Sequence, residues 1–458
     1  MNSHAVYHRA PYPLRVAIAS ARGVVLQHRR YSRDTRGLVA EALGREAWSP
    51  EEWADYQAHR LERVLLGARE HVAAYQGFLG RSGEPVPSLE RIPLLEKERL
   101  RANPQAFVRD DAPRRLVAET TSGTTATPLS LWISRTEYRR WYALFEARWR
   151  SWYGVSGSDR WGIIGGQPVV PPGAEHPPFW VWNAGMRQLY LSSYHIAPHT
   201  AAAYARAIHE HRITYLLGYP SSLYALALAC REMGVRPRRL RVVIGNAEPV
   251  LEHQREVIGE VFGCPVRETY GMAEFVAAAS ECDAGRLHLW PEVGVLEVLD
   301  HTRLATVGAG SPGRLVCTSL LNATMPLIRY VVGDTGALAP TDTTCGCGRT
   351  LPMLASLEGR SDDLVTTADG RFIGRLDPVF KGTLPIAGAQ IIQEDLGRFR
   401  VLVVPAPGYG EDAAASITRR LKERVGEARV EIELIDRLPT GANGKFKAVI
   451  SRVPVGER

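Results

Sequence analysis

Lysine is scarce in this chain of 458 residues. Lysine and arginine together number 56, but only five of them are lysines, at positions 97, 381, 422, 445 and 447. The arginines are scattered among acidic residues, and no run of five like charges occurs. The net charge of +7 therefore does not indicate a nucleic-acid partner, and we expect none.

Cysteine and long apolar runs are also in short supply. Six cysteines are too few for a disulfide framework in a chain of this length, which favours a reducing compartment, so we expect a cytoplasmic location. No apolar stretch reaches about 18 residues, so we expect no membrane-spanning segment. Residues 13–27 fit an amphipathic helix lying on the protein or on a membrane surface, and packing on the protein is the favoured interpretation.

The remaining composition is that of a soluble globular protein, with 45% hydrophobic and 23% charged residues. The length calls for two or three domains. Ser49 with Glu52 and Ser134 with Glu137 form capping-box patterns, which predict the starts of two helices. The first of these helices should run to about Tyr75.

Strand and helix patterns alternate in the middle of the chain. This alternation predicts an α/β fold with a largely parallel sheet, in which ligands bind beyond the carboxyl ends of the strands. The predicted strands cover 161–166, 214–219, 241–247 and 266–271, and the helices cover 200–211, 221–234 and 251–263.

The pattern changes after residue 290. Strands at 294–299, 313–320 and 326–332 have no helices between them, which indicates an antiparallel or barrel-like subdomain. A polar stretch, 359–363, precedes a strand, a helix and a strand at 398–404, 412–426 and 429–435. We therefore expect a large N-terminal domain of residues 1–359 and a small, mobile α+β C-terminal domain of residues 360–458.

The run TTSGTTATP (120–128) is the most distinctive in the chain. A hydroxyl-rich loop with a glycine offers backbone and side-chain donors to anionic oxygens, which is typical of a polyphosphate clamp; an ordinary polar turn is the alternative. A Walker A sequence is absent, and the GxGxxG match at 308–313 contains a proline and leads into a strand, so it is no dinucleotide fingerprint.

Four shorter motifs follow along the chain: YGMAE (270–274), GDTG (333–336), GRSDD (359–363) and PTGANGK (439–445). A tyrosine face can stack on a base, a glutamate can hold Mg²⁺, and an aspartate in a turn can accept hydrogen bonds from ribose. Each motif is weak alone because turns are rich in glycine and aspartate.

Taken in order, the five motifs resemble those of the adenylate-forming superfamily of acyl-CoA synthetases and adenylation domains. The segments LSSYHI (191–196), CGCGRT (345–350) and GKFKAVISRV (444–453) are similar to the phenylacetate–CoA ligase branch and its CapK-like relatives. The resemblance implies an enzyme that uses ATP to convert a carboxylic acid into an acyl-adenylate with release of pyrophosphate. The acyl group would then pass to a thiol, most simply that of CoA.

The resemblance also implies a role for individual residues. The phosphates of ATP would be held by Thr121, Ser122, Gly123, Thr124 and Thr125. Adenine would lie between Tyr270–Gly271 and the segment Gly245, Asn246, Ala247 and Glu248. Glu274 would ligate Mg²⁺, Asp334 and Arg360 would hold the ribose, and Asp362 would be the hinge of the C-terminal domain. Catalysis would fall to Lys445, Glu274 and His195, although a hydrogen-bonded core histidine explains His195 almost as well.

Two positions depart from the family pattern, Ala126 in the phosphate loop and Ala273 before the glutamate. Neither change removes a charged group, so we expect activity. The chemistry favours a lysine at position 445, because charge concentrates at the α-phosphate and a compact cation on a flexible stem can reach it.

Cysteine and histidine form a second group. Cys282 and His288 are six residues apart, and Cys345 with Cys347 makes a Cys-x-Cys pair. Together they would give a tetrahedral, structural Zn²⁺ site, which we favour over four unrelated side chains.

Two other interpretations stay open. The acyl acceptor could be a carrier protein or an amine in a polysaccharide or natural-product pathway, since CapK-like relatives occur in such pathways. The fold could also serve as a non-catalytic nucleotide-binding module. Dimers are common among such ligases, so the resemblance also allows a homodimer.

Overall fold

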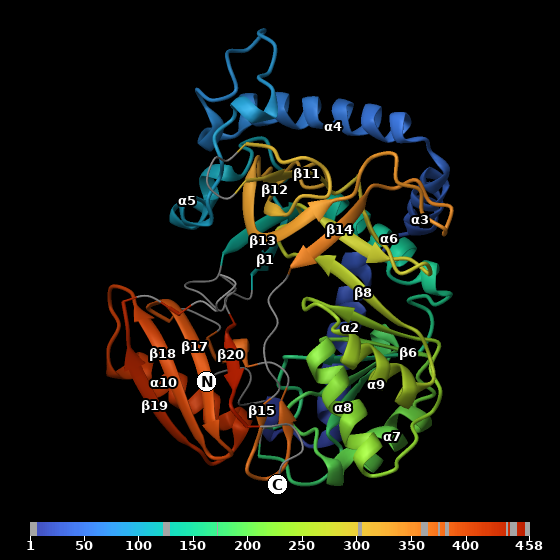
Figure 1. The fold of residues 1–458 in the computed structure, drawn as a ribbon, viewed down its shortest axis with the longest axis vertical. Helices are drawn as coiled ribbons and strands as arrows, with labels where there is room; N and C mark the ends of the chain where they lie inside the picture. Colours follow the sequence, from blue (N-terminus) through green and yellow to red (C-terminus); the bar gives the residue numbers. More distant parts are fainter. Residues whose placement is uncertain are drawn as a thin grey trace.

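A computed structural model describes residues 7–121, 129–171, 173–300, 305–358, 365–373, 376–380, 384–436, 438–439 and 447–453. Within them, helices cover both faces of a mixed sheet (Figure 1). The strand order of this sheet is β11-β12-β13-β14-β10-β9-β8-β7-β6-β3-β5-β4.

The middle of the sheet is parallel, as the alternating pattern predicts. Its parallel strands are β3 (Trp161–Gly165), β5 (Gln188–Ser192), β6 (Tyr215–Gly218), β7 (Val242–Asn246) and β8 (Val266–Gly271), with β4 (Trp180–Asn183) antiparallel at the edge. The helices packed on one face are α7 (Ala201–Glu210), α8 (Pro220–Glu232) and α9 (Glu252–Phe262). Leu223, Leu226 and Cys230 of α8 are fully buried, and so are most of the residues between them, because this largely apolar helix is enclosed on nearly every side.

The other end of the sheet is antiparallel. It contains β9 (Ala278–Glu281), β10 (Leu287–Leu289), β14 (Met353–Glu358), β13 (Tyr330–Leu338), β12 (Gly313–Ser319) and β11 (Gly294–Leu299). In the described residues these strands form one sheet with the parallel strands. Of the two arrangements expected here, antiparallel or barrel-like, the antiparallel one describes them better. β13 starts four residues after the predicted 326, because Arg329 takes a left-handed φ of 49° that interrupts extended backbone.

The N-terminal helices confirm the capping signals. They are α2 (Tyr12–Arg30), α3 (Thr35–Gly44), α4 (Pro50–His71), α5 (Lys97–Ala102) and α6 (Arg135–Arg148). Ser49 and Ser134 each form a complete capping box at the starts of α4 and α6. α4 ends at His71, before the predicted Tyr75, which lies in a short 3₁₀ turn. None of the described helices is long and apolar enough to cross a membrane.

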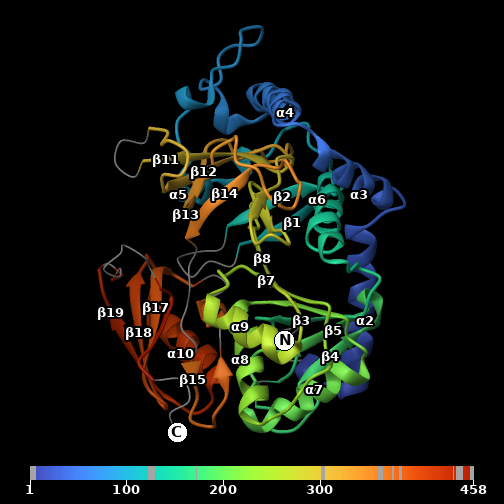
Figure 2. The same cartoon turned by 45° about the vertical axis from the view of Figure 1, so that its right-hand side comes forward.

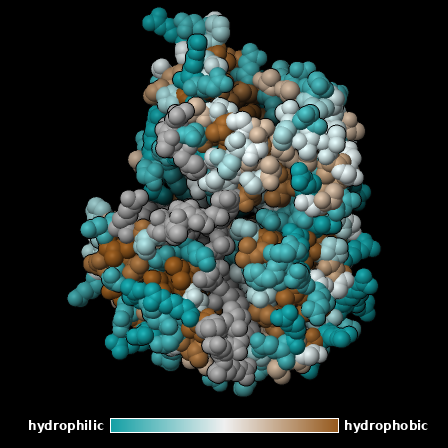
Figure 3. Space-filling model, in the orientation of Figure 1, coloured by the Kyte–Doolittle hydropathy of each residue, from teal (hydrophilic) through white to brown (hydrophobic). Residues whose placement is uncertain are grey.

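A smaller sheet forms the C-terminal part, with strand order β19-β18-β17-β20 (Figure 2). Its elements are β17 (Ile386–Asp395), β18 (Arg398–Pro405), α10 (Glu411–Val425), β19 (Arg429–Leu434) and β20 (Val449–Ser451), preceded by a hairpin of β15 (Val365–Thr366) and β16 (Phe372–Ile373). In the space-filling view, apolar residues gather over β17 and β18, whereas hydrophilic residues cover much of the outline (Figure 3). The predicted boundary at 359/360 and the hinge Asp362 lie outside the described residues.

The C-terminal part is tied to the main sheet by Arg371. Its guanidinium donates to the carbonyl oxygen of Tyr194 at 2.6 Å and to that of Arg424 at 2.9 Å. Tyr194 follows β5 and is buried in the core cluster of the smaller sheet. The two sheets are therefore joined by a hydrogen-bonded and apolar contact in this conformation.

Candidate active site

A cleft with a volume of about 190 Å³ opens at the carboxyl ends of β7 and β8. Its walls come from the segments after β7, from β8, from β13 and β14, and from the start of α5. The lining residues are Lys97, Ala247, Glu248, Pro249, Glu268, Thr269, Tyr270, Gly271, Val332, Asp334 and Leu357. The structure thus gathers Ala247, Glu248, Tyr270, Gly271 and Asp334 from three separate motifs in one place, where a parallel sheet binds ligands.

Tyr270 and Asp334 are hydrogen-bonded across this cleft. The Tyr270 hydroxyl donates to Asp334 Oδ2 at 3.0 Å. Burial, aided by the Asp334 carboxylate, raises the pKa of Tyr270, so the phenol stays neutral and keeps its proton for this bond. The pair presents an aromatic wall and a carboxylate next to each other, which suits a nucleoside.

The two loops beside the cleft are held in strained conformations. Ala247 has φ 64° and Phe275, next to Glu274, has φ 55°, both in the left-handed region that non-glycine residues seldom adopt. Gly245 allows β7 to approach α8 closely, because a Cβ there would lie 3.0 Å from Cγ of Pro220, the first residue of α8. Asn246, between Gly245 and Ala247, is the last residue of β7. Strain of this kind occurs at binding sites, where the surrounding structure enforces it.

Glu274 is a buried carboxylate with two partners. Only 6% of its surface is exposed, and its Oε1 lies 3.3 Å from Lys97 Nζ and accepts a 3.1 Å hydrogen bond from the Tyr330 hydroxyl. Sequence reasoning missed Lys97, which belongs to a six-residue helix without a motif. The scarcity of lysine was the signal that could have singled it out.

Two further carboxylates border the cleft. Glu248 accepts from the backbone N–H of Ser221 in the first turn of α8 at 3.1 Å, where the helix dipole favours negative charge. Glu268, which sequence reasoning also missed, accepts from Val250 N–H at 3.4 Å. Burial raises the pKa of Glu268 to about 7, and the neighbouring Glu281 carboxylate adds to the rise.

Thr121 is the one described member of the proposed phosphate loop. Its backbone N–H donates to Leu129 O and its Oγ1 accepts from Leu129 N–H, both at 3.1 Å. These bonds close the base of the loop between β1 (Leu116–Thr120) and β2 (Ser130–Ser134). The other predicted site residues Ser122, Gly123, Thr124, Thr125, Arg360 and Lys445 lie outside the described residues.

His195 does not line the cleft. It is 3% exposed and stacks on Phe179 with ring centroids 5.1 Å apart. Its Nε2 lies 3.1 Å from Pro171 O, which can only accept, so Nδ1 accepts from the Ser192 hydroxyl at 2.8 Å. This is the geometry of the core alternative, and the catalytic role of His195 stays a prediction.

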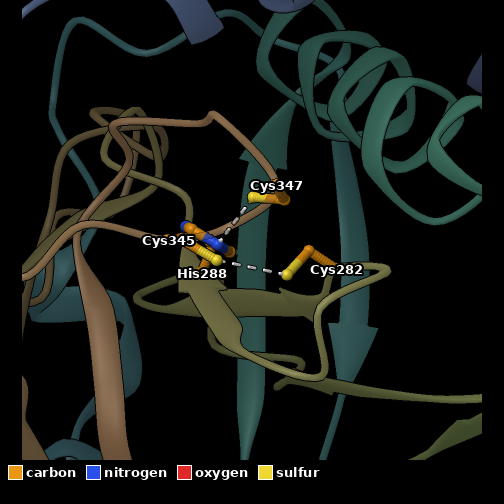
Figure 4. A group of neighbouring side chains, drawn as sticks. All are labelled: Cys282, His288, Cys345 and Cys347. Atoms are coloured by element: carbon orange, nitrogen blue, oxygen red, sulfur yellow. Dashed lines mark hydrogen bonds between the residues drawn. The ribbon is translucent and has the colours of Figure 1, made fainter.

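Cys282, His288, Cys345 and Cys347 converge as the sequence predicts (Figure 4). Their ligand atoms all lie within 4.8 Å of one another, with 3.7 Å between the sulfurs of Cys282 and Cys345 and 3.4 Å from Cys347 Sγ to His288 Nε2. Typical Zn–S and Zn–N bonds set tetrahedral edges of about 3.8 Å and about 3.5 Å, so the donor set fits Zn²⁺.

The histidine of this cluster has the tautomer that a metal ligand needs. His288 Nδ1 donates to Leu351 O at 3.0 Å, which leaves the lone pair of Nε2 facing the sulfurs. Burial lowers the pKa of His288 and keeps the ring neutral. All six cysteines are free thiols.

Comparison with known proteins identifies the domains of this chain and its relatives. A family model described as "AMP-binding enzyme" matches residues 117–323, and one described as "CapK C-terminal domain" matches residues 365–452. Protein CapK of Staphylococcus aureus is 20% identical over 98% of this chain and 99% of its own length. A phenylacetate-coenzyme A ligase of Thermus thermophilus is 28% identical over 68% of this chain and 70% of its own length.

Solved structures share the fold. A 2-hydroxyisobutyryl-CoA ligase in its postadenylation state superposes with a TM-score of 0.56 at 22% identity, covering 89% of this chain and 91% of the other. The same ligase in its thioesterification state gives the same values.

The chain is therefore an AMP-forming ligase of the adenylate-forming class. Within that class it resembles Protein CapK, along nearly the whole chain and through its C-terminal domain. We therefore prefer a ligase to the alternative of a non-catalytic nucleotide-binding module.

The raised pKa of Glu268 predicts a pH-dependent cost to stability. Its folded-state pKa of about 7 lies above the ordinary value of 4.5, so the folded state binds the proton more tightly than the unfolded state. The contribution of Glu268 to stability is therefore complete below about pH 4.5 and is lost as the pH rises to about 7, by roughly 3 kcal/mol. Glu268→Gln should be more stable than the wild type above that range but not below it.

Urea unfolding at about pH 4 and about pH 8, on either side of that range, measures this difference. Glu427→Gln, a change at an exposed position, is the matched control. An equal difference between wild type and Glu268→Gln at both pH values would contradict the assignment.

Proposed function

We propose that this ligase uses ATP and Mg²⁺ to activate a carboxylic acid as an acyl-adenylate and then transfers the acyl group to CoA. The observation that carries the proposal is the cleft at the ends of β7 and β8, where Tyr270, Asp334, Glu274 and Lys97 come together. The names of the relatives, which include a phenylacetate-coenzyme A ligase, support CoA as the acceptor.

In this proposal the described residues bind and orient the nucleotide. Tyr270 and the segment around Ala247 enclose the adenine, and Asp334 accepts from the ribose hydroxyls. The Glu274 carboxylate is a hard oxygen donor of the kind that Mg²⁺ prefers, so it would hold the ion that neutralises phosphate charge. Arg360 would assist at the ribose, and residues 121–125 would bind the phosphates.

Attack of the carboxylate on the α-phosphate places extra negative charge on oxygens that must be stabilised without solvent. We assign this task to Lys445, brought in by residues 360–458 acting as a lid about Asp362. Lys97, which comes from the N-terminal part of the chain, supplies a second cation beside Glu274.

Lys445→Ala should lower acyl-adenylate formation by at least about 100-fold while the fold survives, because a compact cation at the α-phosphate is lost. Acid-dependent pyrophosphate release measures the effect. Lys447→Ala is the matched control, since Lys447 lies two residues away and its backbone carbonyl accepts from the Gln390 side chain of β17. A wild-type rate from Lys445→Ala would refute the role proposed for Lys445.

Lys97→Ala should lower the rate of ATP–pyrophosphate exchange by about 100-fold, and Lys97→Arg by less, because arginine keeps the charge but not the compact geometry. The change also leaves the buried Glu274 carboxylate without its cation, so the melting temperature should fall. Exchange is therefore measured well below that temperature. Lys422→Ala, on the exposed side of α10, controls for loss of a lysine; unchanged exchange in folded Lys97→Ala would reject the role.

The acceptor is tested by the product. With a panel of aryl, aliphatic and amino acids, CoA should accelerate turnover, and mass spectrometry should detect the acyl-CoA thioester. Pyrophosphate release without any thioester would direct the search to a carrier protein or an amine. A cytoplasmic location and a homodimer stay predictions of the sequence.

We further propose that Cys282, His288, Cys345 and Cys347 hold a structural Zn²⁺. The ion would tie the β9–β10 hairpin to the segment between β13 and β14. Purified protein should carry close to one zinc per chain, and Cys345→Ser with Cys347→Ser should remove it and lower the melting temperature. Cys264→Ser, away from the cluster, should keep the metal. Far less than one zinc per wild-type chain would refute the site.

A further inference from the structure

Helix α2 is fixed to the protein by its inner side. Gly23 lies so close to the Asn183 side chain that a Cβ would come within 1.9 Å of its oxygen. Ser20 Oγ accepts from the Ala184 backbone N–H at 3.0 Å, and a Cβ on Gly185 would lie 2.4 Å from Val24 N. These contacts fix the rotation of α2, so the side it turns outward is determined.

The outer side of α2 is apolar, and the described residues leave it uncovered. Leu14, Ile18, Val24 and Val25 are 50%, 43%, 48% and 67% exposed, and they make up half of the eight large apolar side chains exposed in the described residues. Ala17 and Ala21, also exposed, lie between them on the same side of the helix. We call these six residues the α2 stripe. Figure 2 shows α2 along the outer edge of the molecule.

The charge around the α2 stripe is mainly positive. Residues 7–33 contain six arginines and no acidic residue. Arg22 and Arg29 follow Ile18 at i+4 and i+11, so they border the stripe on one side. Arg135 and Arg139 of α6 both donate to His28 O and add positive charge near the end of α2. Glu119 pairs with Arg29, whereas Arg22 is exposed.

These features do not suit a second copy of the chain. A helix of 19 residues is about 28 Å long and about 10 Å wide, so the stripe offers roughly 300 Å². A stable protein interface buries about 800 Å² on each partner. Two copies would also bring arginine-bordered stripes of the same sign together.

A lipid surface removes both objections. A helix with an outward apolar side and arginines at its border lies in the plane of a membrane interface, where anionic headgroups attract the arginines. We propose that the α2 stripe docks this protein peripherally on membranes that contain anionic phospholipids. The surface is independent of the cleft and of the reaction proposed for it.

The test uses the full-length protein and two kinds of vesicle, pure phosphatidylcholine and phosphatidylcholine mixed with phosphatidylglycerol. Co-sedimentation should show binding to the mixed vesicles and much weaker binding to the neutral ones, and added salt should weaken it. Ile18→Glu combined with Val25→Glu should lower the partition coefficient at least about tenfold, and Arg22→Ala about fivefold.

Met233→Glu is the matched control, because Met233 is 55% exposed at the end of α8 and lies outside the stripe. All variants should keep wild-type circular dichroism and ATP–pyrophosphate exchange, since the changes are on the surface. Binding that the double variant leaves unchanged, or no binding of the wild type, would overturn the proposal. A dimer in light scattering that Ile18→Glu with Val25→Glu abolishes would assign the stripe to a second copy instead.

Discussion

The carboxylate of Glu274 constrains the whole site. A buried charge must be paired, because its removal from water costs several kcal/mol without a partner. Its partners come from distant parts of the chain, Lys97 from α5 and Tyr330 from β13. Backbone hydrogen bonds from Leu95 N–H to Arg329 O at 2.9 Å and from Val331 N–H to Leu95 O at 3.0 Å fix these two elements side by side. The N-terminal segment is thereby made a wall of the cleft.

The left-handed turn at Arg329 follows from the same constraint. The Arg329 guanidinium pairs with Glu297 and donates to the Ile92 carbonyl at 2.8 Å, so the segment before α5 is held against β11 and β13. The turn delays the start of β13 until Tyr330, whose side chain then faces Glu274. The strained backbone of Arg329 thus places the Tyr330 hydroxyl against Glu274 in the site.

What the sequence could predict depends on the range of the interactions. The capping boxes at Ser49 and Ser134 are local, so their helices were predicted, and the strand–helix alternation gave the parallel sheet. The continuity of the antiparallel strands with that sheet depends on strand order, which no local pattern encodes. Lys97 and Glu268 escaped notice because neither belongs to a motif, and their importance arises only where distant segments meet. The family resemblance suggested His195, whose hydrogen bonds match the core alternative, so its catalytic role stays a prediction.

Arginine and lysine play different parts in the buried ion pairs of this chain. Buried ion pairs need two parallel hydrogen bonds to offset desolvation, and the planar guanidinium provides them. Arg148 binds Glu292 in this way at 2.7 and 2.8 Å, and Arg329 binds Glu297 similarly. A reaction centre needs a cation that can shift as charge moves. The two parallel hydrogen bonds of an arginine guanidinium would hold the cation in one place, whereas a lysine ammonium can move. In the proposed mechanism, the lysine beside Glu274 would supply a cation that can move as charge develops.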